Sequence, residues 1–364
     1  MAEAEGGDFD RSTVSNWLIE AYDNYLWIVH HALLYFQKQR ALLLADETYS
    51  YARENGESLD TCYFWGLRTS PLDTIGPQIV SFWFDKNRFK LIPEFYLCDY
   101  DGKLQTDGYV AYVDLRLKNG NIVKCGCWVH ARRPVIVALP LGVDQDELTS
   151  GDWVNLWSVQ AAIIMSELFH REAELKDLSP EERLSERQLR LAPLVAFLFK
   201  LCDQVKASPD FDENSEEGRA VNYILSRKRE LSEFLKDGTL QLSTNDLERC
   251  NIIVALVRKR AKFFDSVEGA NAAAGYFSAI ETAEENGVNG EVFLKFLLTV
   301  MPQVMMDYKG EIEEFKTWRD KAKARLEEAR KKHIENPKAK VEINWEGIHI
   351  MMSLTKVDFI VQYY

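Results

Sequence analysis

The order of apolar and polar positions predicts a mixed α/β sheet in the first part of the chain. Apolar side chains recur at helical spacing over residues 11–40. The apolar run 41–45 then predicts a buried strand that ends abruptly at Asp46. Further strands are expected at 62–67, 78–84, 103–107 and 122–129, with a short helix at 89–97. Three strands, a helix and two more strands are typical of a mixed α/β sheet.

A charged helical block is expected from about residue 150 to 240. Ser179-Pro180-Glu181-Glu182 is a capping box with proline at the first helical position. Pro193 falls inside the apolar stripe that follows and is expected to kink or divide that helix. Another helix is expected from 217 to 235. Because the block separates the last strand from the remaining segments, we interpret it as an insertion.

The end of the chain has a different character. Residues 308–332 are rich in lysine and glutamate and predict a helix, and the apolar, aromatic tail 341–364 alternates at 357–361 as a strand would. The tail carries no functional interpretation.

Composition is typical of a globular protein outside the membrane. The 364 residues suffice for one large domain or two ordinary ones, and 46% are hydrophobic and 28% charged. No run approaches the roughly 18 apolar residues of a membrane span. Residues 1–10 are acidic and glycine-rich, unlike a signal peptide. The six cysteines form no CxxC pair, which favours reduced thiols and a cytoplasmic protein.

The net charge and the local charge of the chain point in opposite directions on whether nucleic acid is a partner. The net charge of −13 argues against such a partner, but phosphate contacts need only a local basic face. Residues 245–264 carry five basic side chains against two acidic ones, the basic ones being Arg249, Arg258, Lys259, Arg260 and Lys262. A solvated helix face explains the same pattern.

Three acidic residues are candidates for metal chemistry. Asp46 and Asp107 each end an expected strand, where α/β sheets place ligands. Asp107-Gly108 is also a common turn dipeptide, and Asn245 with Glu248 also fits a helix N-cap and its third residue. If Asp46, Asp107 and Glu248 converge, they suit two Mg²⁺ or Mn²⁺ ions roughly 3.5–4 Å apart that cleave phosphodiesters. Arg258, expected on the same helix as Glu248 and roughly 15 Å further on, would hold flanking phosphates.

Several motifs in order resemble one protein family. They are Ala45-Asp46-Glu47-Thr48, Leu104-Gln105-Thr106-Asp107-Gly108-Tyr109, Cys127-Trp128-Val129-His130-Ala131-Arg132-Arg133, Asn245-Asp246-Leu247-Glu248-Arg249 and Ser278-Ala279-Ile280-Glu281-Thr282. Together they resemble transposases of the insertion-sequence-sixty-six family over most of residues 11–301. The resemblance implies a ribonuclease-H-like mixed sheet with a large all-helical insertion before the third catalytic acid.

The resemblance also implies roles for single residues. Asp46, Asp107 and Glu248 would form the catalytic, metal-binding triad of a DDE transposase that nicks the ends of a mobile element and joins them to target DNA. Residues expected to contact double-stranded DNA are Arg132, Arg133, Arg249, Arg258, Lys259, Arg260 and Lys262. Residues expected to organise the site are Cys127, Trp128, His130 and Asn245. Core packing and base stacking both stay open for Trp128, and a core role stays open for His130. Such an enzyme would act as a homo-oligomer in a synaptic complex, in the bacterial cytoplasm beside the nucleoid.

The resemblance has limits that keep other functions open. We expect this chain to lack the zinc-binding and helix-turn-helix region that usually precedes the family's catalytic part, so recognition of element ends is in doubt. The expected division is 1–40 helical lead-in, 41–150 first part of the core, 151–240 insertion, 241–301 completion of the core, and 302–364 extension of unknown role. Alternatives to a transposase are a catalytically silent DNA- or protein-binding remnant and a nuclease that never joins strands.

Overall fold

A computed structural model describes residues 10–54, 58–73, 75–113, 122–141 and 151–336. Its centre is one five-stranded sheet with strands β1 (Leu42–Arg53), β2 (Leu59–Thr69), β3 (Val80–Asp85), β4 (Lys103–Thr106) and β5 (Val123–Gly126). The strand order is β3-β2-β1-β4-β5. β1 runs antiparallel to β2 and parallel to β4, and β4 runs parallel to β5. The expected mixed α/β sheet is confirmed.

Strand ends differ from the sequence prediction, and the differences in β1 and β5 bear on the site. β1 does not stop at Asp46 but continues to Arg53, because it pairs with β2 along an uninterrupted antiparallel ladder. Strand β5 is shorter than the expected 122–129, since Trp128 already begins helix α5 (Trp128–Val137). The tail strand expected at 357–361 lies outside the described residues.

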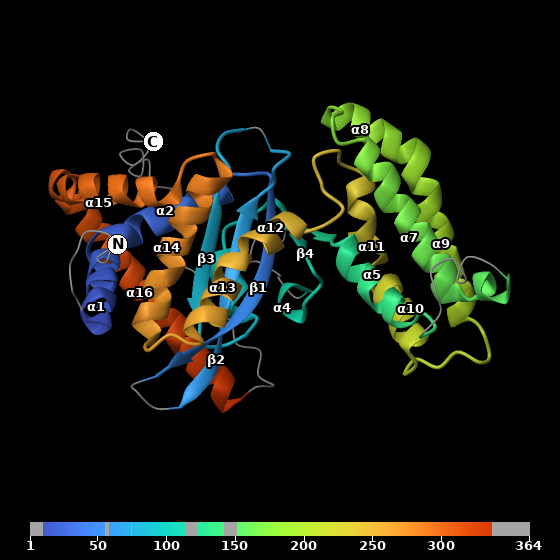
Figure 1. The fold of residues 1–364 in the computed structure, drawn as a ribbon, viewed down its shortest axis with the longest axis horizontal. Helices are drawn as coiled ribbons and strands as arrows, with labels where there is room; N and C mark the ends of the chain where they lie inside the picture. The colour runs from blue at the N-terminus through green and yellow to red at the C-terminus, as the bar shows by residue number, and fades with distance from the viewer. Residues whose placement is uncertain (1–9, 55–57, 74, 114–121, 142–150, 337–364) are drawn as a thin grey trace.

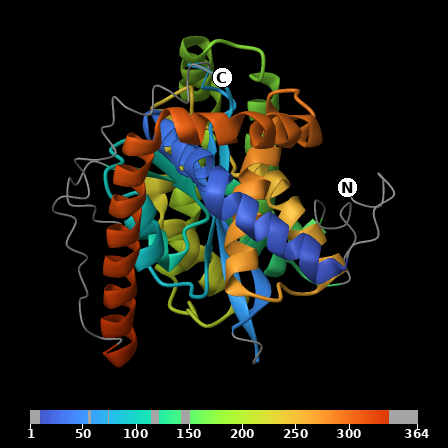
Figure 2. The same ribbon diagram turned by 90° about the vertical axis from the view of Figure 1, so that its left-hand side faces the viewer.

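Helices from the N-terminal and C-terminal parts of the chain lie toward the β3 edge of the sheet, opposite β5 (Figure 1). Helix α1 (Arg11–Ala21), the π-helical turn η2 (Tyr22–Leu26) and α2 (Trp27–Lys38) form one rod across α14 (Val267–Glu285), as Figure 2 shows. The rod confirms the helix expected at 11–40. Helices α15 (Gly290–Asp307) and α16 (Lys309–Glu335) follow, the second confirming the helix expected at 308–332. The short helices α3 (Leu91–Tyr96) and α4 (Val110–Val113) flank β4.

The expected helical block lies beyond the β5 edge of the sheet (Figure 1). Its elements are η3 (Gly151–Asn155), α7 (Trp157–Glu174), α8 (Pro180–Glu186), η4 (Arg187–Leu191), α9 (Ala192–Lys206), α10 (Glu216–Ser226), α11 (Lys228–Ser232) and η5 (Glu233–Leu235). The capping box at Ser179 is confirmed, and the π-helical turn η4 separates α8 from α9 immediately before Pro193. The single helix expected at 217–235 is instead divided at Arg227.

The helical block is fastened by buried polar contacts as well as an apolar core. Arg187 is fully buried, and its guanidinium donates to the carbonyls of Phe234, Asp237 and Leu240 and to the carboxylate of Glu172. These bonds join α7, η4 and the stretch from η5 to Leu240. One arginine therefore holds three parts of the block together.

The chain returns to the sheet through helices α12 (Asn245–Cys250) and α13 (Ile252–Ala261). The expected N-cap, Asn245, is instead the first residue of α12, and Thr244 is the capping position without a side-chain capping bond. Thr244 hydrogen-bonds Cys127 with both its backbone N–H and its hydroxyl, which fixes the helix start by a tertiary contact. Glu248 and Arg258 lie on successive helices that meet at Asn251, not on one helix as expected.

Within the described residues, every helix is too short or too polar to cross a lipid bilayer. All six cysteines are buried, and none is joined to another in the structure.

A buried histidine joins the N-terminal rod to the sheet. His30 Nε2 lies 2.7 Å from the carbonyl oxygen of Phe82, and Nδ1 lies 3.0 Å from the hydroxyl of Tyr22. Nε2 must donate, since a carbonyl only accepts. Full burial disfavours a charged ring, so Nδ1 carries no proton and accepts from Tyr22. The ring is therefore held neutral. Burial is the largest cause that lowers the pKa of His30 to about 3, with Lys323 adding to it.

This neutral histidine predicts a pH-dependent contribution to stability. The unfolded chain protonates His30 below about pH 6.5, whereas the folded chain does not. His30 therefore lowers the free energy of unfolding by about 1.4 kcal/mol when the pH falls from 7.5 to 5.5. Buried carboxyls with raised pKa, such as Asp46, act in the opposite direction. We therefore expect His30→Gln to reduce the loss on acidification by about 1.4 kcal/mol relative to wild type, measured by urea unfolding at both pH values. His170→Gln, at an exposed position, is the control, and an unchanged pH dependence in His30→Gln would contradict the assignment.

Candidate active site

Three acidic side chains predicted from the sequence line one cavity. It has a volume of about 350 Å³ and lies where the β1 and β4 strands meet helices α5 and α12, with Asp46, Asp107 and Glu248 in its wall. Glu47 and His130 line it as well. The fold thus brings together residues that are distant in the sequence.

Sheet register explains why the two aspartates are neighbours. β1 and β4 are paired in parallel with Leu44 opposite Gln105. Continuing that register by two residues on each strand places Asp46 beside Asp107, just past the end of β4. The carboxylate of Asp46 accepts a hydrogen bond of 3.0 Å from the side-chain amide of Asn251, at the junction of α12 and α13.

Asp107 occupies a turn that the helical block holds in place. Its carboxylate accepts from the backbone N–H of Tyr109 at 2.7 Å, and Gly108 has a positive φ of 85°, so the Asp-Gly turn interpretation is also correct. Tyr223 donates to the carbonyl oxygen of Asp107 at 2.5 Å, and Arg227 donates to that of Gly108 at 2.7 Å. A Cβ on residue 108 would lie 2.3 Å from Arg227 Nε, so a larger residue there would displace this arginine side chain as well as adopt the strained positive φ. Sequence reasoning missed Tyr223 and Arg227.

Glu248 is held by basic side chains of α5. Its two carboxylate oxygens lie 3.2 and 3.3 Å from Nη2 of Arg133, and one lies 3.6 Å from Nε2 of His130. Glu248 keeps about a third of its side chain exposed. The ion pair with Arg133 is therefore open to water and exchangeable.

The cavity concentrates negative charge. Burial, acting together with the nearby carboxylates of Glu47, Asp107 and Glu248, raises the pKa of Asp46 to about 8. Burial and the charge of Arg133 lower the pKa of His130. Carboxylates that raise one another's pKa are short of positive charge, which is the condition that a divalent cation relieves.

Glu47 is a fourth carboxylate at the site that the sequence did not single out. Its side chain is nearly fully buried, and one oxygen accepts from Nε of Arg88 at 2.9 Å. Burial raises the pKa of Glu47 to about 7 despite this bond. Arg88 lies over the ring of Tyr109, 3.7 Å from its centroid, which ties the group to the Asp107 turn. The sequence signal for Glu47 was its position directly after Asp46.

The residues expected to organise the site have distinct positions. Cys127 and Thr244 contact each other as described above. Trp128 is fully buried, donates to the carbonyl of Leu231 and packs against aromatic rings of the helical block. It is therefore a core residue. His130 lines the carboxylate cavity and is not a core histidine. Asn245 is exposed at the start of α12.

The basic residues divide into engaged and exposed groups. Arg249 pairs with Glu285 at 3.1 Å, and Arg258 donates to the carbonyl of Tyr49 and lies over its ring. The exposed cations at the end of α13 are Lys259, Arg260 and Lys262. Arg132 and Arg133 lie on α5, beside the carboxylate cavity and a second, larger one.

In their present rotamers the acids do not form a finished metal site. Among the described residues, no three acidic, histidine or cysteine side chains are placed to hold one metal ion. The donor set nevertheless suits Mg²⁺ or Mn²⁺, because Asp46, Asp107 and Glu248 offer hard oxygen atoms.

The fold and site define a class: a mixed α/β protein with an acidic cavity at its sheet, flanked by arginines and a helical block. Comparison with known proteins places it more closely. The chain belongs to the IS66 transposase family, whose model, "Transposase IS66 family", matches residues 1–272. The family resemblance seen in the sequence is thereby confirmed.

Two proteins similar to the chain are from the bacterium Sinorhizobium fredii (strain NBRC 101917 / NGR234). The "Uncharacterized protein y4jD" is 28% identical over 293 residues, which cover 78% of this chain and 53% of that protein. The "Uncharacterized protein y4qI" is 27% identical over 329 residues, which cover 88% of this chain and 58% of that protein. The chain therefore spans little more than half the length of these relatives.

Proposed function

We propose that this chain is the catalytic part of a DNA transposase that cleaves and joins phosphodiesters with two divalent ions, Mg²⁺ or Mn²⁺. The observation that carries the proposal is that Asp46, Asp107 and Glu248, far apart in sequence, line one cavity. Family membership supports a transposase-related function. The strand order β3-β2-β1-β4-β5, with a helical block before Glu248, supports a ribonuclease-H-like core.

The residues of the chain would act on DNA as follows. Bound ions would activate the attacking oxygen and stabilise the leaving oxygen. Asp46 and Asp107 hold their places by the sheet register and the turn, so they are preorganised oxygen donors. Glu248 would join them when Arg133 exchanges its carboxylate for a DNA phosphate, an exchange between two anions that arginine binds alike. Arg133 would thereby couple substrate binding to completion of the site.

The proposal includes partners and place of action. Element ends and target DNA would be double-stranded, and Lys259, Arg260 and Lys262 would contact their phosphates from the exposed end of α13. Action as a homo-oligomer in a synaptic complex, in the bacterial cytoplasm beside the nucleoid, is part of the same proposal.

A second candidate is a catalytically silent remnant that binds DNA or protein. The engagement of Glu248 by Arg133 and His130, in place of a finished metal site, favours it. Metal affinity separates the two, since a scaffold gains nothing from binding cations at these acids.

Calorimetry with Mn²⁺ is the experiment that tests the proposed function. We expect the wild-type chain to bind Mn²⁺ and Asp107→Asn to bind it at least about tenfold more weakly. Arg133→Ala should bind Mn²⁺ up to about tenfold more tightly, because the competing cation is gone, a change of about 1.4 kcal/mol. Arg249→Ala, whose partner Glu285 is outside the cavity, should match wild type. Absence of Mn²⁺ binding in wild type and Arg133→Ala alike would favour the silent remnant.

A further inference from the structure

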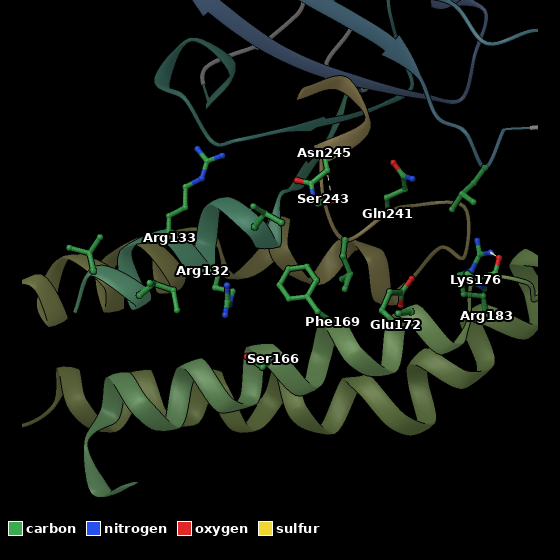
Figure 3. A pocket seen from close by; sticks show the side chains of 16 residues that line it. Arg132, Arg133, Ser166, Phe169, Glu172, Lys176, Arg183, Gln241, Ser243 and Asn245 are labelled. Carbon is green, nitrogen blue, oxygen red and sulfur yellow. Dashed lines mark hydrogen bonds between the residues drawn. The ribbon is translucent and has the colours of Figure 1, made fainter. Parts of the chain in front are cut away.

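A second, larger cavity adjoins the carboxylate cavity. It is a groove of about 1060 Å³ between α5, α7 and the segment 241–245 that leads into α12 (Figure 3). Arg133 lines both cavities. Asn245, at the groove, begins the short helix that carries Glu248. The two cavities therefore meet at Arg133.

The walls of the groove are apolar and open to solvent. Phe169 of α7 lines it, together with Ile136 and Val137 of α5. Ile136 is 39% exposed and Val137 60% exposed, which leaves apolar surface uncovered at a site beside charged groups. Exposed apolar surface of this kind is typical of a binding site.

Polar groups on the segment 241–245 face the same space. Gln241, Ser243 and Asn245 line the groove, as Figure 3 shows. The side-chain oxygen of Gln241 is buried and has no hydrogen-bond partner among the described residues, although its amide donates to Asp246. These groups offer donors and acceptors of the kind that recognise the edges of bases.

The charge of the groove favours an anion. Arg132 and Lys176 line it, and in Figure 3 Arg132 extends into the space between α5 and α7. Nε of Arg132 is buried and forms no hydrogen bond in the described part of the chain. Among the described residues that line the groove, Glu172 supplies the one carboxylate, and it pairs with Arg187 at 2.9 Å.

We infer that this groove binds unpaired nucleotides of the DNA strand next to the phosphodiester held at the carboxylates. Intact duplex presents phosphates on its surface and hides the faces of its bases, so it would use the arginines and leave the apolar walls uncovered. An unpaired strand offers both its phosphates and its base faces, and base faces stack on apolar and aromatic side chains. The inference rests on the proposed function for the identity of DNA as substrate. It adds that the substrate is locally unpaired and that the groove distinguishes it from duplex.

Fluorescence anisotropy with two DNA probes tests the inference. One probe is a 30-base-pair blunt duplex and the other is the same duplex with a six-nucleotide 3′ overhang, both in Ca²⁺ to prevent cleavage. We expect wild type to prefer the overhang probe. Val137→Asp, at an exposed wall position, should weaken overhang binding about tenfold and blunt-duplex binding less than about twofold. Arg132→Ala should weaken overhang binding by a similar factor.

Matched controls lie on α9, outside the groove. Phe197 is 55% exposed there, so Phe197→Asp introduces the same charge on a comparable apolar surface, and Lys200→Ala removes an exposed cation. Both should bind the two probes as wild type does. If circular dichroism shows Val137→Asp to be misfolded, Ile136→Glu replaces it.

The outcomes separate this inference from the proposed function. Equal binding of the two probes by wild type, or an equal loss of both in the groove variants, would overturn the inference in favour of a general phosphate contact. Glu248→Gln should keep the overhang preference in Ca²⁺. A chain that shows this preference yet neither binds Mn²⁺ nor nicks DNA would support the groove and refute the catalytic proposal.

Discussion

Asp46→Asn, Asp107→Asn and Glu248→Gln are each expected to reduce Mn²⁺-dependent nicking of DNA by about a thousandfold or more. Each substitution keeps the shape of the side chain and removes one charged oxygen donor from the cavity that the three acids share. Loss of a donor removes stabilisation of both the attacking and the leaving oxygen, so the effects should be large and far from additive. The measurement is the initial rate of nicking on DNA that bears the element's ends.

The control for nicking must be acidic and outside the cavity. Asp203→Asn on α9 fits, because its carboxylate is exposed and pairs only weakly with Lys228 at 3.3 Å. It should nick at the wild-type rate. Wild-type nicking by all three cavity variants, with circular dichroism unchanged, would show that the chemistry occurs elsewhere.

Arg187→Ala is expected to lower the free energy of unfolding of the helical block by about 3–5 kcal/mol. Its guanidinium is fully buried and bonds three backbone carbonyls and Glu172. Removing it leaves those acceptors and a buried carboxylate without a donor. The loss of stability is large because water cannot replace the bonds. Urea unfolding, followed by circular dichroism, measures the change.

Arg190→Ala provides the comparison for Arg187. Arg190 lies on the same π-helical turn, but its partners Glu174 and Glu186 are surface residues. Surface ion pairs contribute about 0–1 kcal/mol, so little change is expected. Similar small effects for Arg187→Ala and Arg190→Ala would mean that the buried arginine does not hold the block together.

Much of the fold follows from local pattern, whereas strand and helix ends depend on pairing. Apolar runs and the capping box at Ser179 identified most elements, because local propensity and core packing agree there. The predicted end of β1 at Asp46 was wrong. Asp46 follows an apolar run, as a strand terminus would, but it is paired with Gly66 inside a long ladder with β2. The predicted start of α12 was wrong for a similar reason. Thr244 is fixed by a hydrogen bond to Cys127, a residue far from it in the sequence.

The candidate site could be predicted in part. Motif order identified the three acids, and the register of β1 on β4 explains why Asp46 and Asp107 meet. The groups that hold the acids escaped notice, because Tyr223 and Arg227 reach the Asp107 turn from the helical block through tertiary packing alone. The pairing of Arg133 with Glu248 likewise depends on the placement of α5 beside α12.

The most direct measurement of the central claim is anomalous diffraction at the manganese edge from crystals grown with Mn²⁺ and DNA. We predict two anomalous peaks in the cavity, roughly 3.5–4 Å apart, with oxygens of Asp46, Asp107 and Glu248 about 2.0–2.2 Å from them and Arg133 on a DNA phosphate. Manganese bound elsewhere, with Glu248 still paired to Arg133, would contradict the account.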